Sequence, residues 1–303
     1  MWLFLAFISA ALLGFYDVFK KQALKGNAVV PVLTLNTLFS SLIFLPLVVF
    51  SATDHIAESS LFYVPECGWR EHGYIILKSV IVLSSWLCGY FAIKNLPLTI
   101  VGPINATRPM MVLVGAIVFF GERLNLYQWV GVLLAIVSFY LLSRSGKKEG
   151  IDFRHNRWIA LAVLAAALGA LSGLYDKYLM APPEAGGVGV NRMAVQSYFV
   201  FYQLLMMSVV TLFFVSKTPK QKTMWRWSIP LISLFLSAAD FAYFYALTLP
   251  DAMISVVSMV RRGSVLVSFT VGAMVFREKN LRSKAIDLAL VLISMVFLWL
   301  GSR

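Results

Sequence analysis

The feature that most constrains this 303-residue chain is an arginine that recurs in two related apolar segments, as Arg108 and Arg261. The segments align without a gap at an offset of 153, and ten of 32 positions are identical. The identical pairs are Leu83/Leu236, Ser84/Ser237, Tyr90/Tyr243, Phe91/Phe244, Leu96/Leu249, Pro97/Pro250, Arg108/Arg261, Val112/Val265, Leu113/Leu266 and Val114/Val267. Each arginine lies about eleven residues after a proline that opens a predicted helix, about halfway through a membrane span. A cation at that depth is costly and usually functional, and its duplication predicts a site between two halves of a transporter.

The composition supports a membrane protein, because 60% of the residues are hydrophobic and only 13% are charged. Ten apolar segments are long enough to cross a bilayer as helices, which satisfy their own backbone hydrogen bonds. The predicted spans are 2–20, 29–50, 74–94, 98–120, 127–144, 157–179, 193–215, 227–247, 252–276 and 283–301. The predicted fold class is therefore an all-α integral membrane protein with ten transmembrane helices and no separate soluble domain.

A second internal match, at an offset of 159, shows that the repeat covers each half of the chain. It pairs Leu5-Ala6, Ala11-Leu12, Gly14 and Tyr16-Asp17 with Leu164-Ala165, Ala170-Leu171, Gly173 and Tyr175-Asp176. We expect a first five-helix repeat over residues 1–145, a basic linker over 146–156 and a second five-helix repeat over 157–303. Because five is odd, the second repeat enters the membrane from the opposite side, which gives the inverted repeats of alternating-access transporters.

The basic residues favour one orientation. With the N-terminus outside, the cytoplasmic loops hold 17 Lys and Arg, whereas the opposite face holds six, namely Arg70, Lys78, Arg123, Lys177, Arg192 and Arg303. The remaining three are Arg108, Arg261 and Arg262, all inside predicted spans. The positive-inside rule then puts both termini outside, in a bacterial inner (plasma) membrane. The net charge of +12 is thus a topology signal with some contact to membrane lipid, and no nucleic-acid partner is expected.

The turn between predicted spans four and five carries a family resemblance. Gly121-Glu122-Arg123-Leu124, followed by Gln128-Trp129-Val130-Gly131, resembles the Gly-Glu-Arg-Leu turn of EamA-type members of the drug/metabolite transporter superfamily. The second half keeps Glu278 but lacks the Trp-Gly pair. The resemblance covers nearly the whole chain through its repeat plan, and it implies a ten-helix transporter. Members of the superfamily are often drawn with both termini cytoplasmic, opposite to the orientation that the charges favour.

Within the superfamily, the chain is similar to the sugar-phosphate/phosphate translocators at its intramembrane cations. Those proteins have a basic residue on span four and a Lys-Arg pair on span nine that clasp the substrate phosphate. Arg108 and the pair Arg261-Arg262 occupy similar places, with Arg in place of Lys on both spans. The resemblance implies an anionic substrate, and a carboxylate would satisfy the same arginines.

The arginines head the list of candidate site residues. Arg108, Arg261 and Arg262 are predicted to bind an anion through bidentate hydrogen bonds; the alternative is an ion pair with an aspartate that holds helices together. Asn105 lies one turn before Arg108, and Ser258 is its counterpart, so both are candidates to bind substrate or to link helices. Pro103 and Pro109 should bend or open the helix near Arg108.

Carboxylates and aromatic residues complete the predicted site. Asp17 and Asp176 are candidates for gating or proton coupling; the alternative is an interfacial pair with Lys20 or Lys177. Asp240 lies deeper, has no charged counterpart, and could balance an arginine or carry a proton. Trp86 and Tyr243, with Tyr90 and Tyr245 as further candidates, could line the cavity.

These residues predict a secondary-active transporter of a small organic anion, either phosphorylated or carboxylate. The alternatives are an exporter of neutral or zwitterionic metabolites such as amino acids, and a lipid-phosphate flippase. We expect no enzymatic activity, since no Ser-His, Cys-His or paired-histidine arrangement lies in a span. No metal site or cofactor is expected, and no disulfide between Cys67 and Cys88. The sequence does not predict the solute, the direction of transport or the oligomeric state.

Overall fold

The structure, a computed structural model, describes residues 1–24, 26–95, 107–144, 157–215, 224–264 and 281–301, together with Ile104 and Val267. Every regular element in this part of the chain is helical. The α-helices are α1 (Trp2–Leu24), α2 (Val29–Ala52), α3 (Trp69–Asn95), α5 (Arg108–Phe120), α6 (Leu126–Arg144), α7 (Arg157–Met180), α8 (Arg192–Val215), α9 (Ser228–Thr248), α10 (Ile254–Arg262) and α12 (Leu281–Leu300). One short 3₁₀ helix, η1 (Pro183–Ala185), lies in the connection from α7 to α8.

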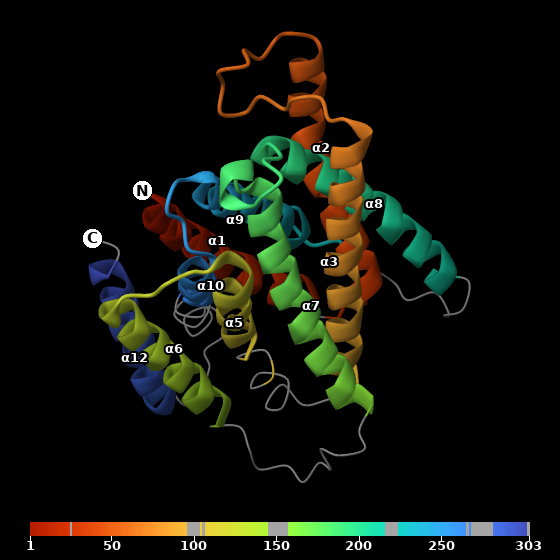
Figure 1. The fold of residues 1–303 in the computed structure, drawn as a ribbon. Helices are drawn as coiled ribbons and strands as arrows, with labels where there is room; N and C mark the ends of the chain where they lie inside the picture. Colours follow the sequence, from red (N-terminus) through yellow and green to blue (C-terminus); the bar gives the residue numbers. More distant parts are fainter. Residues whose placement is uncertain are drawn as a thin grey trace.

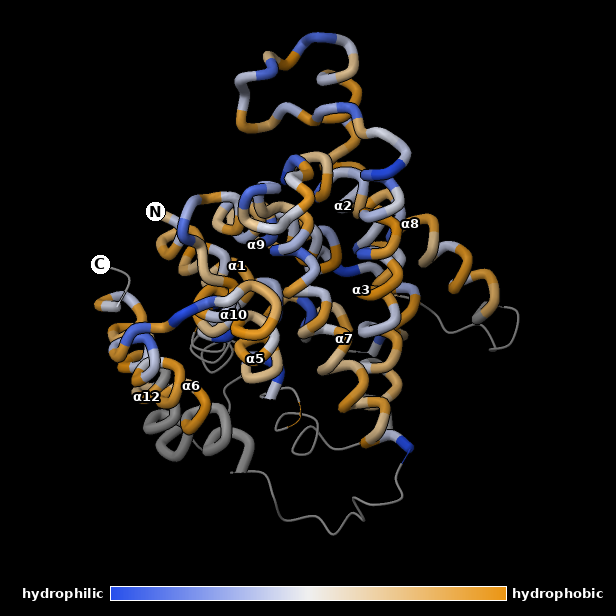
Figure 2. Tube along the Cα trace, viewed as in Figure 1, coloured by the Kyte–Doolittle hydropathy of each residue, from blue (hydrophilic) through white to orange (hydrophobic). Residues whose placement is uncertain are grey.

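These helices correspond one to one with the ten predicted spans, so the all-α membrane fold is confirmed. Among the described residues, α1, α2, α3, α7, α8 and α9 are long and apolar enough to cross a bilayer by themselves. Figure 2 shows hydrophobic residues along the outward-facing helices, and hydrophilic residues in the connection after α2 and in the middle of the bundle. Polar groups inside a membrane bundle face a cavity or each other. The centre of this bundle is therefore the candidate location of a functional site.

Helices of the two repeats are intermingled. In the repeat alignment α1, α2 and α3 correspond to α7, α8 and α9, and the helix packing follows this symmetry: α1 lies along α9 just as α7 lies along α3. Three further pairs, α2 with α8, α5 with α10 and α6 with α12, each join equivalent helices of the two repeats. This exchange of partners is what a two-fold axis between the repeats produces, and an odd number of spans makes them inverted (Figure 1).

A serine-to-backbone hydrogen bond joins the helices of each of two symmetry-related pairs, α1 with α9 and α3 with α7. Ser9 on α1 donates to the carbonyl of Ala239 on α9 at 2.8 Å, and Ser85 on α3 donates to the carbonyl of Ala165 on α7 at 2.8 Å. All four residues are largely or fully buried. Such bonds between helices stabilise a bundle in lipid, where the hydrophobic effect contributes little.

The turn from α5 to α6 holds the helix that carries two of the arginines. Gly121 ends α5 in the left-handed conformation, with φ 62°, and Glu122 then reaches the first turn of α10. The Glu122 carboxylate accepts hydrogen bonds from the amides of Ile254 at 2.6 Å and Ser255 at 3.2 Å, and from the Ser255 hydroxyl. A carboxylate at a helix N-terminus satisfies free amides and complements the helix dipole. A residue of the first repeat therefore fixes the start of α10 in the second.

Two helix ends lie four or five residues beyond the predicted spans. α1 extends to Leu24 rather than to residue 20, and α3 begins at Trp69 rather than at residue 74. Lys78, which was counted with the basic residues of the opposite face, therefore lies well inside α3. Prediction from hydropathy leaves out the charged ends of a helix, although the helix itself continues through them. α10 ends at Arg262, with Gly263 in a turn, and most of the predicted span after it, up to residue 276, lies outside the described residues.

Candidate functional site

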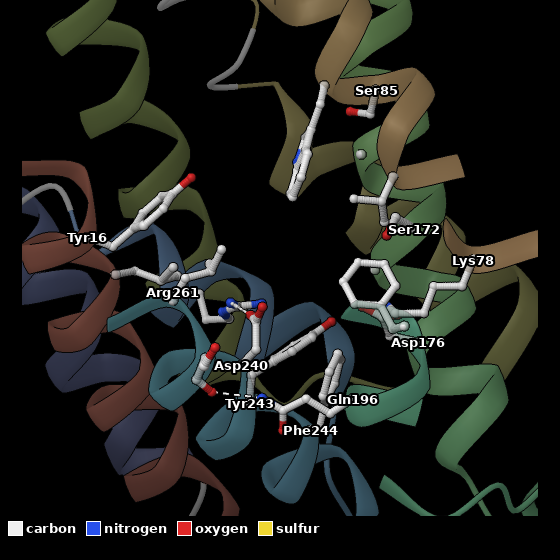
Figure 3. Close-up of a pocket in the computed structure, with 18 of the residues that line it drawn as sticks. Tyr16, Lys78, Ser85, Ser172, Asp176, Gln196, Asp240, Tyr243, Phe244 and Arg261 are labelled. Atoms are coloured by element: carbon white, nitrogen blue, oxygen red, sulfur yellow. Dashed lines mark hydrogen bonds and ion pairs between the residues drawn. The ribbon is translucent and has the colours of Figure 1, made fainter. Parts of the chain in front are cut away.

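A cavity of about 390 Å³ lies at the centre of the bundle, between the two repeats. It is lined by residues of α1, α2, α3 and α5 from the first half of the chain and of α7, α8, α9 and α10 from the second. In Figure 3, Arg261 and Asp240 lie on one side of this space, and Lys78, Asp176 and Ser172 lie on the other. The volume is within the range of small-molecule sites.

Arg108 is the first residue of α5 and not, as predicted, the middle of a helix. Pro109 occupies the first turn, where its missing N–H costs nothing, and this agrees with the predicted opening of the span near Arg108. The guanidinium donates to Ser85 Oγ at 3.5 Å, and its buried Nε has no partner. Among the described residues, no carboxylate pairs with Arg108. An underused buried guanidinium on a cavity wall is suited to bind an anion.

Gly169 on α7 makes room for this arginine. A Cβ atom built on Gly169 would lie 1.2 Å from Arg108 Nη2, so no other residue fits while the guanidinium keeps its position. The slot between Gly169 and Ser85 therefore belongs to the α3–α7 packing. Arg108 comes from the first repeat and rests against a helix of the second.

Arg261 lies in the last turn of α10, where a cation complements the helix dipole. Its Nη2 donates to Asp240 Oδ1 at 2.8 Å, and its guanidinium carbon lies 3.9 Å from the centre of the Tyr243 ring. Its Nε, like that of Arg108, is buried without a partner. Arg262 also lines the cavity, and the negative charge of Asp17 stabilises its positive charge.

Lys78 and Asp176 form an ion pair that the sequence did not reveal. The Lys78 Nζ donates to Asp176 Oδ1, and only 3% and 7% of the two side chains are exposed. The ammonium also lies over the rings of Phe199 at 4.6 Å and Phe244 at 4.9 Å. The predicted alternative, a pair between Asp176 and Lys177, is wrong, because Lys177 donates to the carbonyl of Ala252 at 2.6 Å.

The other predicted residues fall into three groups. Ser258, Trp86, Tyr243 and Asp17 line the cavity, as the arginines and Asp240 do. Tyr245 lies instead against Arg192, at 4.3 Å from ring centre to guanidinium carbon. Asn105 and the Tyr90 side chain lie outside the described part of the structure.

Sequence reasoning missed the amides that line the same cavity. Asn36, Gln196 and Gln203 are almost completely buried on α2 and α8. Gln196 donates to the carbonyl of Ser237 at 2.7 Å and Gln203 to that of Ser79 at 2.7 Å, whereas Gln203 Oε1 has no partner. Amides within apolar spans are costly, so their presence in the sequence was a signal for a polar cavity.

The cavity has an excess of positive charge. Five basic and three acidic residues line it among the described residues, a formal charge of +2: Lys20, Lys78, Arg108, Arg261 and Arg262 against Asp17, Asp176 and Asp240. Lys78 and Arg261 have fixed carboxylate partners, whereas Arg108 has none among the residues that the structure describes. The arrangement is therefore suited to an added negative charge near Arg108.

The two cysteines lie outside this site, and both are free thiols. Cys67 is in the connection that leads into α3. Burial and the neighbouring carboxylate of Glu71 raise the pKa of the Cys67 thiol to about 11. The thiol therefore stays protonated at neutral pH and is a poor nucleophile.

Comparison with known proteins agrees with this architecture. Residues 1–144 match the EamA-like transporter family. An uncharacterized transporter encoded in the cobO 3' region of Sinorhizobium sp. is 28% identical over 143 residues, which cover 47% of this chain and 96% of that protein. An uncharacterized transporter of Pseudomonas aeruginosa is 27% identical over 137 residues, and this match covers 44% of either protein, so it spans less than half of that relative.

A solved crystal structure has the same fold. Its TM-score to this chain is 0.73 at 13% sequence identity, with 100% of this chain and 98% of that chain covered. At this identity the likeness concerns the fold alone. The apolar helices make the chain a multi-pass membrane protein, and residues 1–144 are similar to the EamA-like transporters of the drug/metabolite transporter superfamily.

Proposed function

We propose that this transporter is secondary-active and moves a small organic anion, either a phosphorylated or a carboxylate compound, by alternating access. The observation that carries the proposal is Arg108, a buried cation on the cavity wall that has no carboxylate partner among the described residues. A buried charge without compensation is expensive, and an anionic solute would supply the compensation. The solute is the expected partner, and no catalytic step is assigned to the site.

The substrate contacts follow from the cavity lining. Arg108 and the unused Nε of Arg261 would donate to the anion, with Arg262 and Ser258 as further polar contacts. Asn105 stays a candidate from the sequence alone, since it lies outside the described residues. Trp86 would contact the apolar part of the solute. The Tyr243 ring would hold Arg261 in place through its cation–π contact with the guanidinium. The α5 N-terminus adds its positive dipole end beside Arg108.

Alternating access would come from rocking of the two repeats. The cavity lies where helices of both repeats meet, so a change in their relative tilt would open it to one side and then the other. Asp17 and Asp176, one from each repeat and at equivalent positions, are the proposed gating residues. The predicted boundaries, 1–145 and 157–303, define the moving units.

We further propose a bacterial inner-membrane location with both termini outside. The burial of Lys78 supports this orientation, because it lowers the number of basic residues counted on the opposite face from six to five. A cysteine introduced at the exposed Ser59, in a background without Cys67 and Cys88, should react with a membrane-impermeant maleimide in intact cells. Reaction only after lysis would reverse the orientation.

A thermal-shift screen of the purified protein with organophosphates, carboxylates and amino acids tests the substrate class. An anion at about 100 times its dissociation constant should add roughly 2.7 kcal/mol to the stability of the wild type. The same anion should have no effect on Arg108→Gln. The control is Arg123→Ala, which removes an exposed arginine of the turn after α5 and should respond like the wild type.

The other outcomes decide between the alternatives. Equal stabilisation of the wild type and Arg108→Gln by neutral or zwitterionic solutes would reject the anion site and favour a metabolite exporter. Stabilisation by short-chain phosphatidate, with no response to soluble phosphates, would favour a lipid-phosphate flippase.

A further inference from the structure

The ion pair between Arg261 and Asp240 differs from the other pair in the cavity by being partly exposed. One hydrogen bond joins the two side chains, at 2.8 Å, and 19% and 24% of their surfaces remain exposed. Arg261 keeps its Nε without a partner. A guanidinium has five donors in a planar fork, so Arg261 has room for a second anionic ligand beside Asp240.

An anion bound there would share its cation with Asp240. Two negative charges on one guanidinium, inside a bundle of apolar helices, repel each other as two adjacent carboxylates do. A proton on Asp240 neutralises the carboxylate and removes this repulsion. The positive charge of Arg261 then interacts with the anion alone. Binding of the anion and binding of the proton therefore favour each other, and this linkage is reciprocal.

Within the described part of the chain, Arg261 is the one cation that forms an ion pair with Asp240. α9 packs against α1, α2, α7, α8 and α10. The charged and titratable groups that these helices place around the cavity, together with those of α3, α5 and α9 itself, are Tyr16, Asp17, Lys20, Lys78, Arg108, Asp176, Tyr243, Arg261 and Arg262. Lys78 is held by Asp176, and Asp17 acts on Arg262. Arg261 is the cation in hydrogen-bond contact with Asp240.

The other carboxylates fit this role less well. Asp176 has its own ammonium, buried beneath the rings of Phe199 and Phe244, and this pair does not involve an arginine of the anion site. Asp17 has a counterpart at the equivalent position of the second repeat, whereas the counterpart of Asp240 is Leu87. Asp240 thus breaks the repeat symmetry at the point where an anion would bind.

We propose that Asp240 is a proton-binding site of this transporter and that one proton is carried with each anion. The proton adds to a carboxylate oxygen of Asp240, and no bond of the solute is made or broken. With a singly charged anion, the loaded cavity has the same net charge as the empty one. The inference rests on the proposed anion site, because it needs an anion at Arg261.

Proton-linked binding of non-titrating anions tests the inference. Lactate and isethionate are singly charged near neutral pH and take up no proton there, so any proton uptake belongs to the protein. Calorimetric titration of the full-length protein in detergent, in two buffers of different ionisation enthalpy, gives both the affinity and the proton count. For the wild type we expect uptake of about one proton per anion and a dissociation constant that rises about tenfold per pH unit. Asp240→Asn should bind both anions with no proton uptake and no pH dependence.

The other ion pair is the alternative proton site, and the double variant Lys78→Met with Asp176→Leu removes it as a unit. Loss of the proton uptake in this variant but not in Asp240→Asn would assign the proton to Asp176 and overturn the inference. Arg123→Ala, outside the cavity lining, is the control and should keep the proton uptake. Anion binding by the wild type without proton uptake would overturn it and leave the anion site intact. Absence of binding by both probes, with no anion effect in the thermal-shift screen, would reject the proposed function and the inference together. If Asp240→Asn does not fold, the proton count of the wild type still decides.

Discussion

At the scale of single residues, the position of Arg108 depends on what faces it. Its guanidinium lies in a slot that exists because residue 169 has no side chain and because Ser85 offers an oxygen. The neighbouring Gly173, one turn along α7, is different: a Cβ there would meet its nearest atom, the Tyr243 hydroxyl, at 3.8 Å. The two glycines therefore allow a test of the slot with the same chemical change.

We expect Gly169→Ala to displace Arg108 and to abolish anion-dependent stabilisation. The added methyl group would overlap the guanidinium, and overpacking of this kind costs about 1–3 kcal/mol. Gly173→Ala should fold and bind anions normally, because its methyl group makes only ordinary van der Waals contacts. The thermal midpoint with and without anion measures both effects, and equal behaviour of the two variants would show that the slot does not hold Arg108.

The sequence predicted which residues gather at the cavity better than it predicted their surroundings. The arginines were found because their duplication is visible in one sequence. Lys78 was counted with the basic residues of the outer face, because it lies only four residues after the predicted start of its span, although Ile75, Ile76 and Leu77 precede it. The partners of these residues come from distant segments, such as Asp176 for Lys78, and no local pattern encodes such pairs.

At the scale of elements, α10 is short, and its position depends on its start. Glu122 caps it from another repeat, across 132 residues of sequence. Hydropathy predicted the spans that precede and follow this turn, and the resemblance singled out the Gly-Glu-Arg-Leu stretch. Neither predicted that the glutamate would cap a distant helix, because a cap is normally sought within its own helix.

We predict that Glu122→Ala lowers the free energy of unfolding by about 1–2 kcal/mol, since two amides and a hydroxyl lose their acceptor. Anion affinity should fall as well, because Arg261 and Arg262 lie on the helix that is no longer fixed. Arg123→Ala changes the next, exposed residue of the turn and is the control. Chemical denaturation of both variants gives the measurement, and an unchanged stability of Glu122→Ala would exclude the capping role.

At the scale of the whole molecule, the Lys78–Asp176 pair joins the two repeats through α3 and α7. Loss of one partner leaves a buried charge, which typically costs about 3–5 kcal/mol. Removal of both partners in favour of apolar residues of similar volume is often neutral. We therefore expect each single substitution to lower the free energy of unfolding, whereas replacement of both residues should change it little.

Accordingly, Lys78→Met should unfold at a clearly lower temperature than the wild type, and the double variant Lys78→Met with Asp176→Leu should recover most of the loss. Thermal unfolding in one detergent, for the wild type, both single variants and the double variant, completes the cycle. Additive losses would mean that the two side chains are not coupled and that the pair does not join the repeats.

The partner exchange between the repeats has a consequence for how the chain holds together. α1 lies on α9 and α3 on α7, so the largest helix contacts of either half are made with the other half. The two halves are therefore held together mainly by helix–helix contacts. We expect these contacts to keep the halves associated even without the covalent connection between α6 and α7. A chain cut within residues 145–156 should remain one particle on size exclusion, and two halves synthesised as separate polypeptides should assemble into the same bundle.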